Sequence, residues 1–266
     1  MNSRDLLIAM AVHYQGDERA IINALLRKDI ISDELAESHL KSVKSNVMTI
    51  LDPDYPSYLK EVYFPPLVLF YYGDISLIYS LDDNVAVVGG RKPSPEGASN
   101  VYYIVQGICR HYNIVSGLAR GIDSIAHRAS LENGGKTIAV LANGIDFCYP
   151  TENSELYEII KKNNLVISEY YGTVPPDKTN FHQRNRLITA FAKCTIIGEA
   201  RKISGTLITA NYTLNMNRTL MSIPSGNILD SLPNELIKEG CPILTEPNDV
   251  LMYLNDEKKS LLCDVK

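Results

Sequence analysis

Short apolar runs alternate with stretches of helical periodicity along most of the chain. Residues 85–88 form an unbroken valine-rich run, typical of a strand covered on both faces in a parallel sheet. Apolar residues at helical spacing follow from Val101 to Ile108. The pattern repeats, and predicts strands over residues 112–116, 137–141, 165–168, 194–198 and 219–223, with helices ending near residues 131, 163, 192 and 214. Strands that alternate with helices predict an α/β protein with a doubly wound parallel sheet.

The two ends of the chain depart from this repeating pattern. Residues 1–45 carry apolar positions at helical spacing with mixed charges between them, which predicts a small N-terminal helical module. We expect it to act in packing or as a spacer; the alternative is a helical unit that binds DNA or a partner. Residues 52–74 are rich in proline and predict a loop, a short helix and a strand. The predicted parts are therefore a helical module (1–45), a core (46–255) and a charged tail (256–266).

Composition limits the classes of function. The chain has 266 residues and a formal net charge of -5, so binding to nucleic acid would require a local basic patch. The five cysteines show no CxxC spacing and predict buried free thiols, with neither zinc nor disulfides. No signal peptide and no apolar stretch of membrane-spanning length is visible, so we expect a cytoplasmic protein with no membrane partner.

A glycine turn after the first predicted strand is the first candidate binding site. Gly89 and Gly90 allow the backbone to turn tightly and to approach a ligand, and Arg91 lies in the same turn. Ser94 is a good N-cap, and Pro95 fits the first position of a helix. Unpaired amides at a helix start favour an anion, for which phosphate is the natural candidate. The alternative is a plain crossover turn that binds nothing.

Two further turns follow predicted strands, at residues 116–121 and 204–205. The carboxyl ends of parallel strands lie on one edge of a sheet, so we expect all three turns to converge on one groove. The candidate residues of these turns are Gly89, Arg91, Ser116, Gly117, Arg120, Ser204 and Gly205. Two alternatives remain open: the glycines only close the turns, or one small nucleotide fills the groove.

Cations and an aromatic ring are interleaved in residues 177–186, DKTNFHQRNR, which we expect to form a loop. This segment contains Phe181 among the cations Lys178, Arg184 and Arg186. Cations for phosphates and rings for bases are what single-stranded nucleic acid binding requires. A solvated basic loop is the alternative.

Candidate catalytic groups carry a weaker signal. Asp123, His127, Glu169 and Glu199 lie near predicted strand ends, but no nucleophile and base pair and no metal-ligand spacing is visible. We expect His127 to be structural and Asp123 to cap a helix. The residues therefore predict no catalytic site, no metal and no cofactor.

Five segments resemble, in order and spacing, the motifs of the bacterial DNA-processing protein A family (DprA, also called Smf). They are VVGGRKPSPEG, SGLARGIDSIAH, GKTIAVLANGIDFCYP, ISEYYGTVPPDKTNFHQRNRLI and SGTLITA, within a resemblance that covers residues 50–254. The resemblance implies a Rossmann-like core that binds single-stranded DNA, protects incoming DNA and loads the RecA recombinase during natural transformation. It also implies a homodimer and a protein that is not an enzyme.

The resemblance assigns roles to residues as well. The implied main DNA contacts are Arg91, Lys178 and Phe181. Backbone approach is implied at Gly89, Ser116 and Gly117, and support of the same groove at Arg184 and Arg186.

The chain departs from the family pattern at three places. GGR stands where GSR is usual, His182 replaces a proline, and SIPSGN follows Arg218 where the family favours a VPG turn. Dimer and RecA contacts are expected in this last region. The rival class is a Rossmann-like nucleotide-processing enzyme of the phosphoribohydrolase type, whose PGGxGT turn the sequence lacks.

Overall fold

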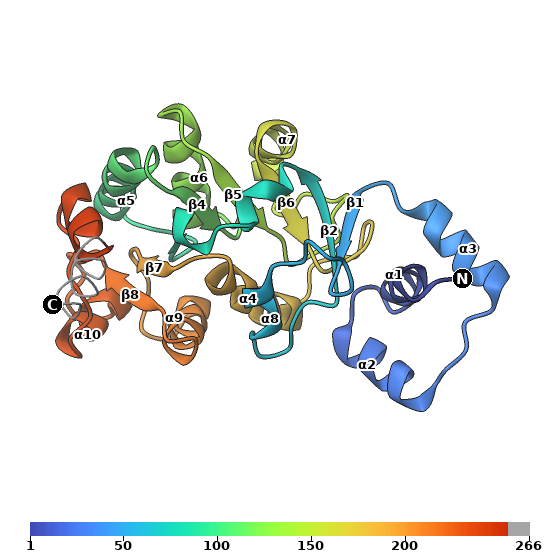
Figure 1. Cartoon of the computed structure of the whole chain (residues 1–266). Helices are drawn as coiled ribbons and strands as arrows, with labels where there is room; N and C mark the ends of the chain where they lie inside the picture. The colour runs from blue at the N-terminus through green and yellow to red at the C-terminus, as the bar shows by residue number, and fades with distance from the viewer. Residues whose placement is uncertain (255–266) are drawn as a thin grey trace, which may run out of the picture.

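The computed structural model describes residues 1–254, so the charged tail predicted over residues 256–266 lies outside the described residues. An eight-stranded sheet runs through the molecule, with helices on both faces and a group of helices at its N-terminal end (Figure 1). The strand order is β1-β2-β6-β5-β4-β3-β7-β8.

Six parallel strands form the centre of the sheet. They are β3 (Asn84–Val88), β4 (Asn113–Ser116), β5 (Thr137–Val140), β6 (Leu165–Ser168), β7 (Cys194–Ile197) and β8 (Thr219–Ser222). Each agrees with a predicted strand to within one residue at either end. Every residue of β3 and β7 is buried, as expected for strands covered on both faces.

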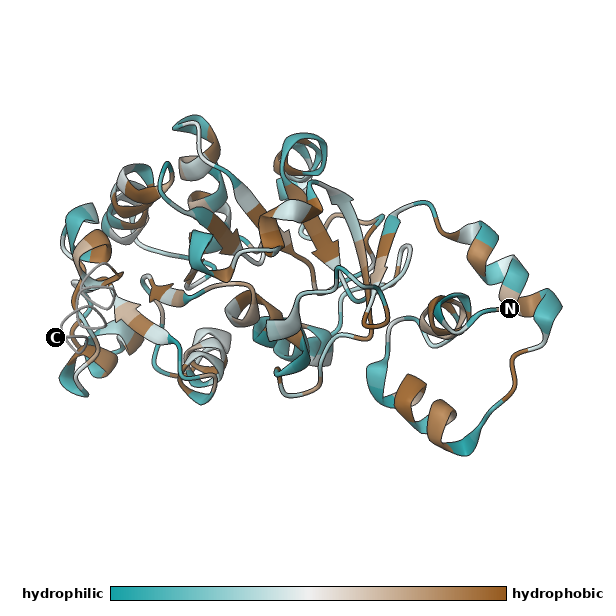
Figure 2. Ribbon diagram, in the orientation of Figure 1, coloured by the Kyte–Doolittle hydropathy of each residue, from teal (hydrophilic) through white to brown (hydrophobic). Residues whose placement is uncertain are grey.

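Helices cover both faces of this parallel region. One face carries α5 (Pro95–Ile108), α6 (Ile122–Glu132) and α7 (Ser154–Asn163), and the other carries α4 (Ser57–Lys60), α8 (Lys178–Ala190) and α9 (Gly205–Asn215) (Figure 1). Apolar residues lie on the strands and on the inner helix faces (Figure 2). Successive residues of β3 alternate between the two hydrophobic layers, Val85 and Val87 in one, Ala86 and Val88 in the other. The predicted doubly wound, Rossmann-like fold is confirmed.

The sheet is mixed and not parallel throughout, which corrects the prediction. β2 (Val68–Gly73) pairs antiparallel with β6, and β1 (Asn46–Thr49) pairs antiparallel with β2. The strand predicted within the proline-rich segment is β2. The pattern misses β1, because four residues of which only two are buried give no clear periodicity. Together the two strands cover an edge of β6 that would otherwise be unpaired.

Three helices precede the sheet: α1 (Ser3–His13), α2 (Glu18–Arg27) and α3 (Asp33–Ser42). Each is capped by a side chain, from Asn2, Asp17 and Ser32 respectively. Buried residues of α1 and α2 belong to one hydrophobic cluster with β2, β5, β6 and α7. The helices of the predicted module are present, and the domain boundary at residue 45 stays a prediction because the module shares its core with the sheet.

The remaining elements are short. Three 3₁₀ helices span Ile75–Ile78, Leu81–Asp83 and Thr151–Asn153, and α10 spans Leu232–Lys238. Residues 247–254 are also helical. Among residues 1–254, no helix combines the length and the apolar character that crossing a membrane requires.

Candidate nucleic-acid interface

A cavity of about 300 Å³ lies at the carboxyl ends of β3 and β7. These strands are neighbours in the sheet, and the chain winds away from them in opposite directions, which makes this edge the switch point where open α/β sheets bind ligands. The three predicted turns and helix α8 all contribute to its walls. The lining side chains include Gly89, Arg91, Ala119, Asp123, Lys178, Phe181, His182, Arg184, Asn185, Ser204 and Gly205.

The turn after β3 leaves no room for side chains at its two glycines. The Gly90 amide donates to the Glu199 carbonyl at 2.7 Å, and the Ile122 amide donates to the Gly90 carbonyl at 3.1 Å. A Cβ atom on Gly89 would lie 2.5 Å from Ile122 Cγ1, and one on Gly90 would lie 3.0 Å from the Glu199 carbonyl oxygen. The turn therefore requires glycine for packing, and it holds the exposed Arg91 at the cavity wall.

The N-terminus of α5 is already occupied, which corrects the prediction of an open anion site there. The Glu199 carboxylate accepts hydrogen bonds from the Ser94 amide at 3.0 Å and from the Ser94 hydroxyl at 2.5 Å. Ser94 also caps the helix by accepting from the Gly97 amide. A carboxylate thus takes the place predicted for phosphate.

The segment 177–186 is helical, whereas the sequence analysis predicts a loop. Asp177 is the N-cap of α8 and accepts from the Thr179 amide at 2.7 Å, so the helix begins at Lys178. Helical spacing then places Lys178, Phe181 and Asn185 along the cavity. The aspartate before the basic residues is a sequence signal for a helix N-terminus, but the prolines just upstream favour a loop.

Two guanidinium groups lie close to the Phe181 ring. Its ring centroid is 4.9 Å from Arg91 Cζ and 5.7 Å from Arg184 Cζ, both within the range of a cation–π contact. The Tyr149 ring lies 6.0 Å away on the chain segment before α7. The half-buried Phe181 ring and the exposed Lys178 thus lie together at the cavity, as predicted.

Arg184 forms the floor of the cavity and is only 4% exposed. Its Nη1 donates to the Gly117 carbonyl at 2.6 Å and to the Val140 carbonyl, so it ties α8 to the ends of β4 and β5. Burial lowers the pKa of Arg184 to about 10, and the buried Asp123 carboxylate acts in the opposite direction. Burial raises the pKa of Asp123, which accepts from the Gly117 amide at 3.2 Å.

Ser204 and Gly205 open α9 at the cavity. The Ser204 hydroxyl donates to the Arg201 carbonyl at 2.8 Å, and among the described residues no side chain caps this helix. A Cβ atom on Gly205 would meet nothing within 4 Å. The first amides of α9 therefore offer the positive helix end that α5 does not.

Four predicted site residues do not reach the cavity directly. The Ser116 hydroxyl is buried and donates to the Val87 carbonyl, while Gly117 lies behind the Arg184 guanidinium, which a Cβ atom would strike. Arg120 is exposed and pairs with Glu152. Arg186 is 4% exposed and pairs with Glu18 and Glu169, away from the cavity.

Several lining residues are absent from the predicted site, among them His182 and Asn185 of α8. His182 is exposed, and Asn185 donates from Nδ2 to the Gly205 carbonyl at 3.3 Å, which links α8 to α9. The helical spacing of residues 178, 181, 182 and 185 is the signal that would have identified them.

His127 is structural, as predicted. It is fully buried, and its Nδ1 lies 2.6 Å from Thr137 Oγ1. Burial lowers its pKa to about 3, so it stays neutral. Within residues 1–254, no group of three or more histidine, cysteine, aspartate or glutamate side chains could hold a metal ion.

The fold and the cavity define a class, a Rossmann-like protein with a cavity lined by basic and aromatic residues at the switch point of its sheet. Residues 46–255 match the model of the DNA recombination-mediator protein A family, and the chain belongs to this family. The resemblance found in the motifs is thereby confirmed. Membership in a family of recombination mediators also confirms the predicted non-enzymatic class of function.

Several relatives are similar over most of their length. DNA processing protein DprA of Streptococcus pneumoniae is 42% identical over 223 residues, which cover 82% of this chain and 78% of the relative. DNA processing protein DprA of Bacillus subtilis is 36% identical over 213 residues, which cover 79% and 71%.

Two solved structures share the fold. The X-ray structure of DNA processing protein A from Streptococcus pneumoniae has a TM-score of 0.75 and 35% sequence identity, covering 93% of this chain and 92% of that chain. A structure of DNA processing protein A from Helicobacter pylori, described with a single-stranded DNA binding mode, has a TM-score of 0.71 and 28% identity, covering 82% and 98%.

Proposed function

We propose that this recombination mediator binds single-stranded DNA at the cavity beside α8 and loads the RecA recombinase on it. The observation that carries the proposal is the cluster of Phe181, Arg91 and Lys178 at the switch point. An aromatic ring beside cations can stack on a base of any sequence, while the cations bind the flanking phosphates. The single-stranded DNA binding mode described for the Helicobacter pylori relative supports this assignment.

The proposed contacts fall into two groups. Arg91 and Lys178 bind phosphates, Phe181 stacks on a base, and the first amides of α9 at Ser204 and Gly205 receive a further phosphate. The second group shapes the surface behind them. Gly89 keeps the turn packed against Ile122, and Ser116 and Gly117 support the Arg184 guanidinium from behind. Arg184 supplies positive charge at the floor, Arg120 lies in the turn after β4, and Arg186 fixes α8 from behind.

The first test compares a single strand with a duplex. Labelled oligo-dT and the matching duplex are titrated with the wild-type protein by fluorescence anisotropy at two salt concentrations. Binding to the single strand alone, weaker at the higher salt, is the expected result, because a duplex cannot offer unstacked bases to Phe181. Equal affinity for both would contradict the proposed site.

RecA loading and a homodimer are the finer parts of the proposal. Exposed apolar side chains at Leu214, Ile228 and Leu229 lie in the chain region expected to make these contacts. Mass photometry is expected to give twice the monomer mass of 29.6 kDa. RecA filament formation on oligo-dT covered by a single-strand binding protein is expected to accelerate when the protein is added.

A nucleotide-processing enzyme is the alternative class, and the carboxylates near the cavity disfavour it. Glu199 is engaged by Ser94, and Asp123 is buried against the Gly117 amide, so neither is free to act as a base. Adenosine monophosphate added to the oligo-dT titration is expected neither to be cleaved nor to compete at concentrations near the DNA affinity. Release of free adenine would support the nucleotide-processing enzyme instead.

A further inference from the structure

The N-terminal module contacts the segment that leads into α8. This segment, residues 169–177, connects β6 to the helix that carries Lys178 and Phe181. Gly16 has a φ of 81° and lies so close to the Glu169 carbonyl that a Cβ atom would collide with it. The Tyr171 hydroxyl donates to the Ser42 carbonyl at 3.0 Å. The segment is thus held by Gly16, which lies between α1 and α2, and by Ser42, the last residue of α3.

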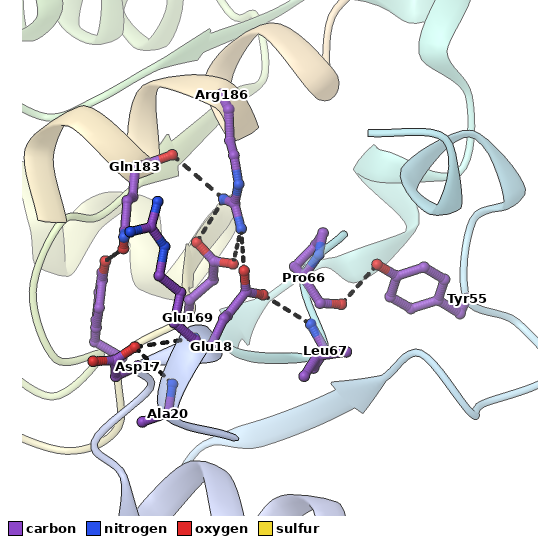
Figure 3. A network of polar contacts seen from close by, with 11 residues as sticks. Asp17, Glu18, Ala20, Tyr55, Pro66, Leu67, Glu169, Gln183 and Arg186 are labelled. Carbon is purple, nitrogen blue, oxygen red and sulfur yellow. Dashed lines mark hydrogen bonds and ion pairs between the residues drawn. The ribbon is translucent and has the colours of Figure 1, made fainter. Parts of the chain in front are cut away.

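A third contact, made by Glu18 at the start of α2, is buried and joins its carboxyl group to the Arg186 guanidinium (Figure 3). Arg186 Nη2 lies 2.6 Å from Glu18 Oε2 and 2.5 Å from Glu169 Oε1, and Arg186 Nη1 lies 2.8 Å from Glu169 Oε2. The other oxygen of Glu18 accepts from the Leu67 amide at 3.0 Å. One guanidinium of α8 is therefore fixed from the sheet by Glu169 and from the module by Glu18.

The same network reaches the DNA-binding end of α8. Arg186 Nη1 donates to the Gln183 carbonyl at 3.4 Å, and the Tyr170 hydroxyl donates to Gln183 Oε1 at 3.2 Å. Gln183 lies two residues from Phe181. Arg186 follows Lys178 by eight residues, which is about 12 Å along a helix axis. A shift of Arg186 would therefore move the ring and the ammonium group at the cavity.

The two carboxyl groups face a single guanidinium in a buried space. Burial and the charge of Glu169 raise the pKa of Glu18 to about 10, so Glu18 holds a proton near neutral pH. Other titratable or charged groups around the pair include Asp17, Arg19, Tyr55 and Tyr170. A glutamine at this position would keep the volume, but its single oxygen could accept from Leu67 or from Arg186 and not from both, while Arg186 would keep Glu169.

We propose that Glu18 is a positioning residue for the DNA-binding helix α8, acting through Arg186 and Glu169 from the N-terminal module. This gives the module a role in DNA binding without any contact between the module and DNA. The inference rests on the proposed function, because its main readout is the affinity for single-stranded DNA.

The test uses the full chain with Glu18→Ala, Glu18→Gln and the control Glu37→Ala, whose exposed carboxylate on α3 pairs with Lys41. Oligo-dT affinity is measured by anisotropy, and hydrogen exchange of residues 178–190 is measured in the free protein. Glu18→Ala is expected to weaken binding by about three- to thirtyfold, the range of a coupling between sites. Its salt slope is expected to be unchanged because no phosphate contact is lost. Exchange in α8 is expected to be faster.

The other variants distinguish a positioning role of Glu18 from a general loss of stability. Glu18→Gln keeps the volume and one of the two contacts, so it is expected to fall between the wild type and Glu18→Ala in affinity and in exchange, and Glu37→Ala is expected to match the wild type in both. Wild-type affinity and exchange in Glu18→Ala would overturn the proposal. If Glu18→Ala does not fold, Glu18→Asp replaces it, since the shorter side chain withdraws the carboxyl from Arg186, and wild-type affinity in that variant overturns the proposal.

A wild-type protein that binds no oligo-dT would refute the proposed function alone, and hydrogen exchange would still decide whether Glu18 positions α8.

Discussion

At the residue scale, Phe181 shows how neighbours determine what a side chain can do. Alone, a half-buried phenylalanine on a helix is an ordinary packing residue. Arg91 and Arg184 lie over its ring, and the exposed Lys178 lies one turn earlier on α8. This combination of a ring and cations is suited to a stacked base with its phosphates.

Replacement of Phe181 tests stacking separately from charge. Phe181→Ala is expected to weaken oligo-dT binding by about 1–3 kcal/mol, the contribution of one stacked base, without a change in the salt slope. Phe181→Tyr keeps the ring and is expected to bind like the wild type. Both are measured by anisotropy over a salt series. A changed slope in Phe181→Ala would argue against stacking.

The glycines of the site divide into two kinds, which a thermal unfolding experiment can distinguish. Gly89→Ala is expected to destabilise the fold by about 1–3 kcal/mol, because the added methyl group strikes Ile122. Gly205→Ala is the matched control, since its Cβ atom meets nothing within 4 Å. Equal melting temperatures in the two variants would contradict the packing role of Gly89.

At the element scale, the strands were the part of the fold that the sequence predicted well. Runs such as 85–88 and 165–168 are buried on both faces and therefore apolar without interruption. Helix α8 was mispredicted over its first two turns, because its polar and basic residues face the cavity and do not produce an apolar stripe. The short antiparallel strand β1 was missed for lack of length.

The first turn of α8 depends on its N-cap, and two substitutions separate the cap from the charge. Asp177→Asn keeps a capping side chain and removes a negative charge beside the cavity, so it is expected to bind oligo-dT at least as well as the wild type. Asp177→Ala makes the same charge change without a cap and is expected to bind roughly fivefold more weakly than Asp177→Asn, because Lys178 and Phe181 lie in the frayed turn. Equal affinity of the two variants, measured by anisotropy, would show that the cap is irrelevant.

At the scale of the whole molecule, contacts far apart in the sequence determine what single residues do. The sequence placed Arg184 and Arg186 together in one basic segment, and the structure separates their surroundings completely. Arg184 forms the cavity floor, whereas Arg186 faces Glu18, which lies 168 positions earlier in the chain. No local pattern contains that pairing, so the burial of Arg186 was not predictable from the segment alone.

The buried carboxyl pair makes the stability of the whole protein depend on pH. A folded-state pKa of about 10 for Glu18 lies above the unfolded value, so this group contributes most below pH 4.5, and that contribution is lost as pH rises toward 10. The glutamine side chain in Glu18→Gln does not titrate, so it makes no such pH-dependent contribution. Its unfolding free energy relative to the wild type is expected to rise between pH 6 and pH 8, by up to about 1.4 kcal/mol per pH unit. Urea unfolding at three pH values measures this, and a difference that falls with pH would contradict the assignment.

The measurement that tests the central claim most directly is the salt dependence of oligo-dT binding by wild type, Lys178→Ala and the control Lys162→Ala. Lys162 is exposed in the last turn of α7, which leads to the opposite edge of the sheet. If the cavity beside α8 is the DNA site, Lys178→Ala lowers the affinity and reduces the slope of log K against log salt by about 0.7, one phosphate contact on a single strand. Lys162→Ala then behaves like the wild type. Unchanged affinity and slope in Lys178→Ala, or an equal loss in both variants, would place the DNA elsewhere on the molecule.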